Sequence, residues 1–493
     1  MSRTAALSLV AAGAICLAGS PLNAQSDDVS RLVAALLGDT PLIEDARALT
    51  DEIGGRPTGS PANLAAVEWA LARFRSADVA ARREAFTMPA LWLERSASAT
   101  VSGEGISFPP RVAAMPFAAA TGAPGVTAPL VDAGRGTAED FRRLGARARG
   151  AFVLIETDEL ADIEGLFREY TDAAGIEGRA FDAGVAGVVY MGSRPNNLLY
   201  RHNASLGPAN QHRLLVMERD AASRILRLLR GGTALTLTAH LDIESGGSYE
   251  SYNVVGEITG STKPDEIVVI GAHLDSWDLG TGALDNGANV AMVIDMARQI
   301  RRLGLQPART IRFVLFNGEE QGLIGSWKYT VAHLDEMDEH VLASSFDIGT
   351  GRIVGFFTGG RPEIVDAVEQ VLEPVRGLGP FQQLDVPIVG TDNFDFMMQG
   401  VANIVAIQEP ANYGPNYHAR SDTFDKVDQH QLRLNGAIAA AVIYGFATMD
   451  VTWKRQTRAE IEALVAATDL EQQMRTFGIW ESWAEGRRGR VRR

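Results

Sequence analysis

The sequence predicts an α/β protein with a mixed, largely parallel central sheet flanked by helices, into which a smaller α/β domain is inserted. Three observations lead to this prediction. Short apolar runs typical of buried strands alternate with helical segments over residues 241–450. A second group of such runs lies between residues 111 and 240, with helical or loop segments of its own. A chain of 493 residues is also too long for one typical core.

The first 24 residues predict a cleaved secretory signal. They contain one arginine near the start, an apolar run too short to span a bilayer comfortably, and a small residue at Ala24. Cleavage there would remove Cys16, the only cysteine, and with it any disulfide or thiolate metal site. Because Cys16 precedes the string LAG, soluble export to the periplasm or the extracellular space is favoured over a lipid anchor. We therefore expect no membrane anchor in the mature chain.

The charge balance argues against nucleic-acid binding. The sequence contains 46 Lys and Arg against 61 Asp and Glu, a net charge of −15. An acidic surface of this kind repels phosphate backbones. The sequence also lacks a GxSxG elbow, a Walker loop and, in the mature chain, a cysteine nucleophile. None of these three motifs therefore competes to explain the chemistry of the protein.

Residues 25–110 are expected to form the N-terminal part of the larger domain. A helix is predicted from Pro61, after the turn-rich string GGRPTGSP. Its apolar face would consist of Leu64, Val67, Leu71 and Phe74. Residues 111–240 form the predicted insert, with strands at PLVDAG, GAFVLIET, AGVVYMG and HRLLVME.

Residues 241–450 carry the main α/β alternation. The predicted strands and helices are, in order, YNVVGEI, EIVVIGA, the helix NVAMVIDMARQIRRLG, TIRFVLF, the helix LIGSWKYTVAHL, VLASSF, RIVGFF and ANIVAI. In residues 451–493 we expect one terminal helix, which begins with a capping box at Thr457 and Glu460, and then a frayed basic tail, GRRGRVRR.

Ionisable residues gather just past the ends of these predicted strands, where sites form in open sheets. They are His273, Asp275 and Asp285 after EIVVIGA, Glu319 and Glu320 after TIRFVLF, Asp347 after VLASSF, and His418 in the later string YHARSDTFD. Histidine nitrogen and carboxylate oxygen are zinc ligands. Two metal ions that share one carboxylate need about two histidines and three acids, with a further acid free to act as a base. The sequence supplies this set.

Five strings together resemble a known family. GAHLDSWDLGTGALDNGAN, FNGEEQGLIGS, FDIGTG, GTDNFDF and YHARSDTFD are similar to the motifs of dinuclear-zinc exopeptidases, which include bacterial leucyl aminopeptidases and glutamate carboxypeptidases. HLDSWD with its short glycine loop resembles the plasma glutamate carboxypeptidase branch. The resemblance covers most of the mature chain. It implies the zinc exopeptidase fold, a protease-associated domain as the insert, a peptide substrate and a homodimer.

The resemblance also assigns ligands for two Zn²⁺ ions per chain. His273 and Asp347 would hold one ion. Glu320 and His418 would hold the other, and Asp285 would bridge the two. Two of these acids have a simpler interpretation. Glu320 lies in a Glu-Glu pair that could merely mark the start of a helix, and Asp285 could merely form an Asx turn.

Three further residues receive catalytic roles from the resemblance. Glu319 would be the general base. The carboxylate of Asp275 would accept the second ring N–H of His273 and fix its tautomer. Tyr417 would stabilise the oxyanion, although it could equally be a packing aromatic. The family also implies a cis peptide bond between Asp285 and Asn286.

Other polar residues near the motifs allow weaker interpretations. Arg361 and Arg420 could clamp a substrate carboxylate or could be solvated. Asp278 is interpreted as a loop acid, and Asp392 as a neighbour that supports the metal loops. The remaining histidines are interpreted as structural or surface residues: His202, His212, His240, His333, His340 and His430.

The leading hypothesis is thus an exported zinc exopeptidase that hydrolyses dipeptides or short peptides. Two alternatives use the same scaffold. A glutaminyl-cyclase-like acyltransferase would bind a single zinc ion, and a receptor-like binding protein would be non-catalytic. The presence of all five predicted ligands argues against both.

Overall fold

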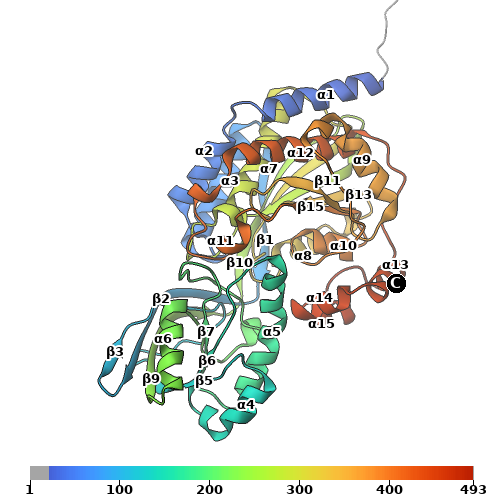
Figure 1. Cartoon of the computed structure of the whole chain (residues 1–493). Coiled ribbons are helices and arrows are strands. Elements are labelled where there is room, and N and C mark those ends of the chain that lie inside the picture. The colour runs from blue at the N-terminus through green and yellow to red at the C-terminus, as the bar shows by residue number, and fades with distance from the viewer. Residues whose placement is uncertain (1–20, 492–493) are drawn as a thin grey trace, which may run out of the picture.

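The computed structural model of the protein describes residues 21–491. These residues contain two sheets, which lie one after the other along the long axis of the molecule (Figure 1). The predicted α/β class is confirmed. The predicted signal segment lies mainly outside the described residues, and its last four residues, 21–24, begin helix α1. No helix in the described part of the chain has both the length and the apolar character needed to cross a membrane.

The larger sheet has seven strands within residues 21–491, in the order β1-β10-β12-β11-β13-β15-β14. The four inner strands β12, β11, β13 and β15 are parallel, and the flanking strands pair antiparallel with their neighbours. The bounds are β1 Ala80–Met88, β10 Tyr249–Ile258, β11 Lys263–His273, β12 Arg309–Phe316, β13 His340–Ser345, β14 Ile353–Phe357 and β15 Asn403–Gln408.

Helices cover both faces of this sheet, which explains why its inner strands are apolar throughout. Along β11, Val268 and Ile270 pack into the core beneath α7 and α12, whereas Ile267 and Val269 pack into a second core toward α8 and α10. The helices of this domain are α1 Pro21–Leu36, α2 Leu42–Arg47, α3 Pro61–Ser76, α7 Ala288–Arg302, α8 Ile324–Ala332, α9 Val365–Leu372, α10 Asn393–Met398, α11 Tyr413–Asn416 and α12 Gln429–Thr448.

Helix α3 forms where the sequence predicts it, and Ser60 caps its N-terminus by accepting a hydrogen bond from the backbone N–H of Asn63. Val67, Leu71 and Phe74 are buried as predicted. The prediction is wrong for Leu64, which is 48 % exposed. Ala66 and Ala70 complete the buried face instead, because the helix packs closely enough for small side chains to fill it.

The second sheet extends further along the chain than the predicted insert. Its order is β3-β2-β9-β5-β6-β7-β8-β4, and it runs from Leu91 to Gly246 rather than from 111 to 240. The reason is a long antiparallel pair, β2 with β9, whose exposed polar residues gave no apolar run to detect. The bounds are β2 Leu91–Gly103, β3 Ile106–Phe108, β4 Val112–Ala114, β5 Val126–Asp132, β6 Phe152–Ile155, β7 Gly187–Met191, β8 Leu214–Met217 and β9 Leu235–Gly246.

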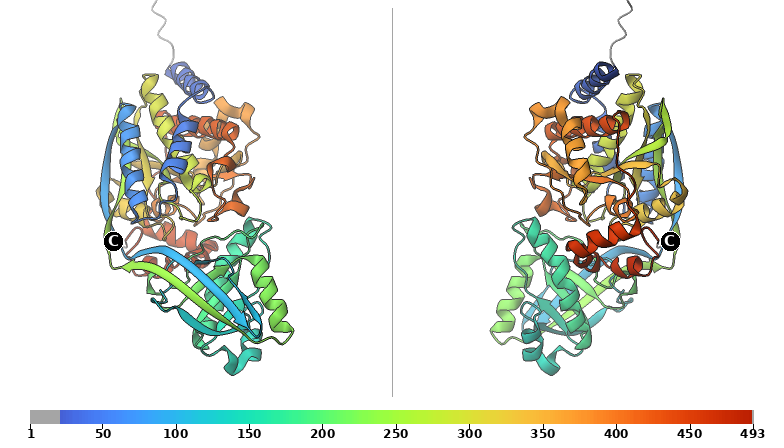
Figure 2. Two further views of the ribbon diagram at one scale, coloured as in Figure 1. Left: turned by 90° about the vertical axis from the view of Figure 1, so that its left-hand side faces the viewer. Right: turned by 90° about the vertical axis from the view of Figure 1, so that its right-hand side faces the viewer.

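One two-stranded ribbon joins the two sheets. Strand β1 ends at Met88 and β2 begins at Leu91, while β9 ends at Gly246 and β10 begins at Tyr249. Since β1 pairs with β10 and β2 pairs with β9, the chain enters and leaves the second sheet through adjacent strands (Figure 2). The helices of the inserted domain are α4 Ala138–Leu144, α5 Ile163–Asp182 and α6 Arg219–Arg230.

The C-terminal segment differs from the prediction in two ways. The capping box is confirmed, since Thr457 and Glu460 exchange side-chain and backbone hydrogen bonds. However, the single expected helix is three short ones, α13 Arg458–Ala467, α14 Leu470–Thr476 and α15 Trp480–Ala484. The described part of the tail is also not frayed, because Arg488 is buried in an ion pair with Asp395.

The packing of α3 on the sheet predicts the effect of adding one methyl group to β10. A Cβ atom at Gly256 would lie 2.9 Å from the nearest ring atom of Phe74, whose ring packs at a tilt against that of Phe313. We expect Gly256→Ala to lower the free energy of unfolding by about 1–3 kcal/mol through overpacking. Thermal and urea denaturation would measure the loss.

The matched control is Gly178→Ala on the exposed side of α5, where a Cβ atom meets nothing within 4 Å. This variant should be neutral or slightly stabilising. In a Phe74→Leu background the penalty of Gly256→Ala should shrink. Equal penalties in both backgrounds would contradict the proposed contact.

Candidate metal centre

Three neighbouring parallel strands deliver the central residues of the site. Strand β11 ends at His273, which lies in register with Phe316 of β12, and β13 pairs on the other side of β11. The chain after β12 turns through Glu319 and Glu320, and the chain after β13 carries Asp347. Because the carboxyl ends of parallel strands share one edge of the sheet, their side chains converge.

The five predicted ligands come together as two groups that share one carboxylate. His273 Nε2 lies 2.9 Å from Asp347 Oδ1 and 3.0 Å from Asp285 Oδ1. His418 Nε2 lies 2.8 Å from Glu320 Oε2 and 3.4 Å from Asp285 Oδ2. All five side chains are buried. Asp285 thus directs one oxygen toward each histidine.

Backbone carbonyls orient both histidine rings. His273 Nδ1 lies 2.9 Å from the carbonyl oxygen of Asp275, and His418 Nδ1 lies 3.2 Å from that of Arg201. If each Nδ1–H donates to its carbonyl, each Nε2 is left free to bind a cation. The prediction that the Asp275 carboxylate accepts this proton needs correction, because its Oδ1 lies farther away, at 3.7 Å.

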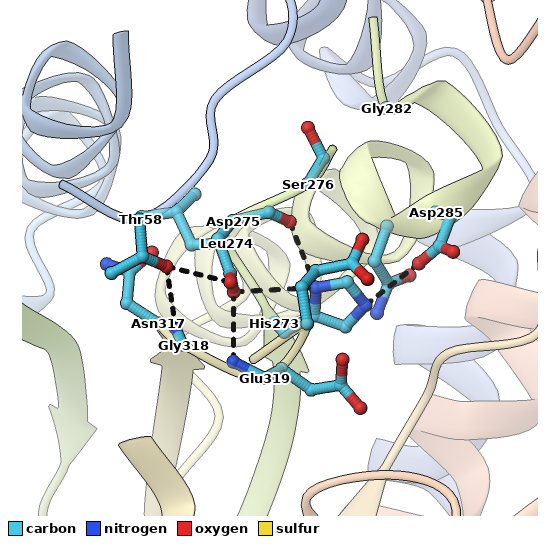
Figure 3. A network of polar contacts seen from close by, with 12 residues as sticks. Thr58, His273, Leu274, Asp275, Ser276, Gly282, Asp285, Asn317, Gly318 and Glu319 are labelled. Carbon is cyan, nitrogen blue, oxygen red and sulfur yellow. Dashed lines mark hydrogen bonds and ion pairs between the residues drawn. The ribbon is translucent and has the colours of Figure 1, made fainter. Parts of the chain in front are cut away.

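The Asp275 carboxylate instead connects the turns around the site (Figure 3). Its Oδ2 accepts a hydrogen bond from the Thr58 hydroxyl at 2.8 Å, and its Oδ1 accepts one from the backbone N–H of Glu319 at 3.3 Å. The Thr58 hydroxyl in turn accepts from the N–H of Gly318. Asp275 therefore holds the turn that presents Glu319.

Glu319 belongs to neither group of candidate ligands, and its side chain remains partly accessible. Burial, opposed by His273 and reinforced by Asp347, raises the pKa of its carboxyl well above the ordinary value. Nearby cations would reverse this effect and favour the ionised form.

Unpaired carboxylate oxygens provide a test of whether this site suits a cation. Among the described residues, Asp285 Oδ2 and Glu320 Oε1 are buried without a hydrogen-bond donor. Burying such oxygens without a partner is costly. Two imidazoles and three carboxylates are also zinc ligands in the proportion that a catalytic pair of ions needs. The residues present therefore fit two metal ions.

Asp422 and Arg56 shape the loop that carries Asp285, and sequence reasoning missed both. Asp422 accepts hydrogen bonds from the N–H groups of Ala283, Leu284 and Asp285 at 3.1, 2.6 and 3.2 Å. Burial raises the pKa of Asp422 to about 7. Asp422 stands in the quoted string YHARSDTFD, four residues after His418. Its distance from Asp285 along the chain concealed its role.

Arg56 is fully buried and donates to three backbone carbonyls on both sides of the same loop, those of Leu274, Thr281 and Gly282. In this loop the peptide bond between Asp285 and Asn286 is cis, as the resemblance implied. The sequence signal for Arg56 was only its place in the turn-rich string GGRPTGSP.

The inserted domain reaches the site through a short segment. Arg201 donates its backbone N–H to the carbonyl of His418 and pairs through its side chain with Glu94 and Asp278. Asn203 donates to the carbonyl of Glu320 at 2.8 Å. The loop acid Asp278 therefore fastens the insert to the metal loop.

Tyr417 lies against the site but is held by the insert. Its ring stacks on His418 with centroids 3.7 Å apart, and its hydroxyl lies 3.0 Å from that of Tyr170 on α5. Burial raises the pKa of Tyr417 well above its ordinary value, so its hydroxyl stays protonated. The oxyanion role of Tyr417 stays a prediction.

The remaining predicted candidates belong to neither of the two ligand groups. Arg361 is buried and bonds to Glu363, Gly400 and Lys454, so it does not face the site, and Arg420 is exposed. Asp392 is buried without a hydrogen-bond donor to its carboxylate within residues 21–491, and burial raises its pKa to about 8. The six histidines interpreted as structural belong to neither group in the described chain.

The comparisons with known proteins find similarity to peptidases. Residues 253–443 match the family model of Peptidase family M28. The chain is 32 % identical to carboxypeptidase Q of Xenopus laevis over 234 residues, which is 47 % of this chain and 49 % of that protein. It is 31 % identical to the probable lipoprotein aminopeptidase LpqL of Mycobacterium tuberculosis over 254 residues, 44 % and 49 % of the two chains. The matches span about half the length of these relatives.

Two solved structures share the architecture over most of the chain. The peptidase M28 precursor of Shewanella amazonensis SB2B is 28 % identical, with a TM-score of 0.79 over 87 % of this chain and 98 % of its own. The zinc aminopeptidase of Bacillus subtilis called BSAP, at 21 % identity and a TM-score of 0.62 over 85 % and 94 %, shares the fold. The predicted resemblance is thus confirmed.

The hydrogen bonds of Asp422 predict a role in metal affinity. In Asp422→Asn, the side-chain NH₂ group would face backbone N–H donors, and the loop that carries Asp285 would shift. We expect zinc affinity to fall about 10- to 100-fold, as it does when groups that support metal ligands are lost. Titration of the metal-free protein with zinc would measure it.

Asp425→Asn is the matched control, because Asp425 is exposed and its side chain contacts Thr423 and Lys426. Its affinity should equal that of the wild type. Unchanged affinity in Asp422→Asn would show that the loop holds its shape without this carboxylate.

Proposed function

We propose that the protein is an exported zinc exopeptidase that hydrolyses dipeptides or short peptides with two metal ions. The observation that carries the proposal is the position of Asp285, whose two carboxylate oxygens serve two separate histidine-acid groups. The match of residues 253–443 to Peptidase family M28 supports a peptidase, and the name of the Bacillus subtilis zinc aminopeptidase supports zinc as the metal.

In this proposal His273 and Asp347 would hold one ion, and Glu320 and His418 would hold the other. Asp285, which belongs to both groups, would serve both ions. Bound there, the two ions would lower the pKa of a water molecule between them and polarise the peptide carbonyl. The backbone carbonyls of Asp275 and Arg201 keep both histidines in the tautomer that this requires.

Glu319 is the proposed general base. Its carboxylate is not needed as a ligand, and its backbone N–H is fixed by Asp275. It would accept a proton from the attacking water on one carboxylate oxygen and later deliver that proton to the leaving amine. This return of the proton balances the reaction, because hydrolysis leaves the enzyme unchanged.

Tyr417 is proposed to donate a hydrogen bond to the developing oxyanion. Its hydroxyl stays protonated, and Tyr170 can accept or donate to set its direction. Preorganised donors of this kind act strongly in sites from which water is excluded. We also propose export, on the basis of residues 1–24, and a homodimer, on the basis of the family resemblance.

Hydrolysis of unblocked dipeptides by the purified mature protein tests the function. We expect release of free amino acids that a chelator abolishes and added zinc restores. Glu319→Gln should keep its zinc but lose turnover by at least about 100-fold, within the range that general base catalysis contributes. Amino-acid analysis and metal analysis of the same samples would measure both.

Glu336→Gln is the control, since Glu336 pairs with Arg312 outside the site and should leave turnover unchanged. Dipeptides blocked at either end would show which terminus must be free. Wild-type turnover in Glu319→Gln would refute the role of this residue. Absence of hydrolysis from every dipeptide by the zinc-loaded wild type would refute the exopeptidase.

A further inference from the structure

The end of the chain returns to the larger domain through Arg488. Its side chain is 5 % exposed, and its guanidinium makes a two-pronged ion pair with Asp395 on α10, at 2.7 and 2.6 Å. Asp395 itself is fully buried and also accepts from the Ser326 hydroxyl on α8. In Figures 1 and 2 the C-terminal helices lie beneath α8 and α10 and against the inserted domain.

The same guanidinium binds the turn that presents Glu319. Arg488 Nη1 donates to the carbonyl of Gly322, and Nη2 donates to the carbonyl of Leu323, each at 3.2 Å. The N–H groups of Gly322 and Leu323 donate to the carbonyl of Glu319, each at 2.9 Å. Arg488 therefore binds the last residues of a turn whose hydrogen bonds begin at Glu319.

The conformation of this turn makes the support necessary. Leu323 has a φ of 60°, in the left-handed region that non-glycine residues rarely adopt, and Gly322 has a φ of 114°. A residue in such a conformation persists only when its surroundings impose it. On the other side of Glu319 the turn is held by Asp275 and Thr58. Arg488 supplies the opposing restraint.

Stability alone is a poor explanation for a buried arginine here. Desolvating a guanidinium and a carboxylate costs several kcal/mol, and well-packed apolar residues often replace such pairs without loss. An apolar pair could not, however, donate to the carbonyls of Gly322 and Leu323. The planar fork of arginine serves both the carboxylate and the carbonyls at once.

We propose that Arg488 is a positioning residue for the reaction, which acts by holding the turn from Gly318 to Leu323 so that Glu319 faces the metal centre. The proposal rests on the function proposed above. Loss of the restraint should lower kcat about 10- to 100-fold with KM nearly unchanged, because a shift of about 1 Å in a catalytic group can cost that much.

The first test compares Arg488→Gln with Arg487→Gln. Arg487 is the adjacent residue, is exposed and pairs only with Glu485 among the contacts described for its side chain, so it controls for a change in the tail. We expect reduced kcat only in Arg488→Gln, with zinc content unchanged in both. Wild-type kcat in a folded Arg488→Gln would overturn the proposal.

A double variant separates positioning from simple charge balance. Arg488→Gln alone leaves the charge of Asp395 buried and unpaired, which destabilises the region, whereas Asp395→Asn with Arg488→Gln removes both charges. If Arg488 only neutralises Asp395, the double variant should regain wild-type kcat. If Arg488 positions the turn, kcat should stay low although the melting temperature recovers.

Hydrogen–deuterium exchange tests the restraint without any substrate. Peptides that cover residues 317–324 should exchange faster in the double variant than in the wild type or in Arg487→Gln. Equal exchange in all three would overturn the proposal whether or not the protein is a peptidase. Faster exchange in the double variant, together with a wild-type protein that hydrolyses no dipeptide, would refute the proposed function but leave the restraint on the turn supported.

Discussion

The structure depends on a group of carboxylates buried at one edge of a sheet. Asp285, Glu320 and Asp347 each bring a negative charge to the same place, and Asp275 and Asp392 lie buried close by. Like charges cannot share a site of low polarity unless cations compensate them. Arg56 supplies one positive charge nearby, but its guanidinium is occupied with backbone carbonyls. Divalent ions held between the two histidines, as proposed, would satisfy this constraint, and the rest of the fold would then serve as a frame for them.

The frame draws on four separate parts of the chain. Parallel strands bring His273 and Asp347 to one edge, and Asp422 shapes the loop of Asp285 from a position far away in sequence. The inserted domain orients His418 through a carbonyl at Arg201. The C-terminal tail contacts the turn after Glu319. Because each part makes hydrogen bonds to the backbone around the site, a small displacement of any one part would move the ligand side chains.

The strands and the candidate ligands could be predicted from sequence because both are local signals. Apolar runs such as EIVVI mark strands buried on both faces, and the acids follow directly where those strands end. The supporting residues could not be predicted in the same way. Asp422 and Arg488 act through partners more than 130 and 90 residues away along the chain, and only the folded structure brings them together. A basic C-terminal string is normally solvated, so the burial of Arg488 gave no sequence signal. The edges of the insert were missed because β2 and β9 are polar on their exposed face.

Metal content is the most direct test of this account. Mass spectrometry of the purified mature protein, dialysed against trace zinc, would count ions per chain in the wild type, in His418→Ala and in Asp285→Asn. The account predicts about two zinc ions in the wild type, about one in His418→Ala, and loss of both in Asp285→Asn, because only Asp285 serves both groups. A wild type that binds one ion or none after zinc is added, or an Asp285→Asn variant that keeps two, would contradict it.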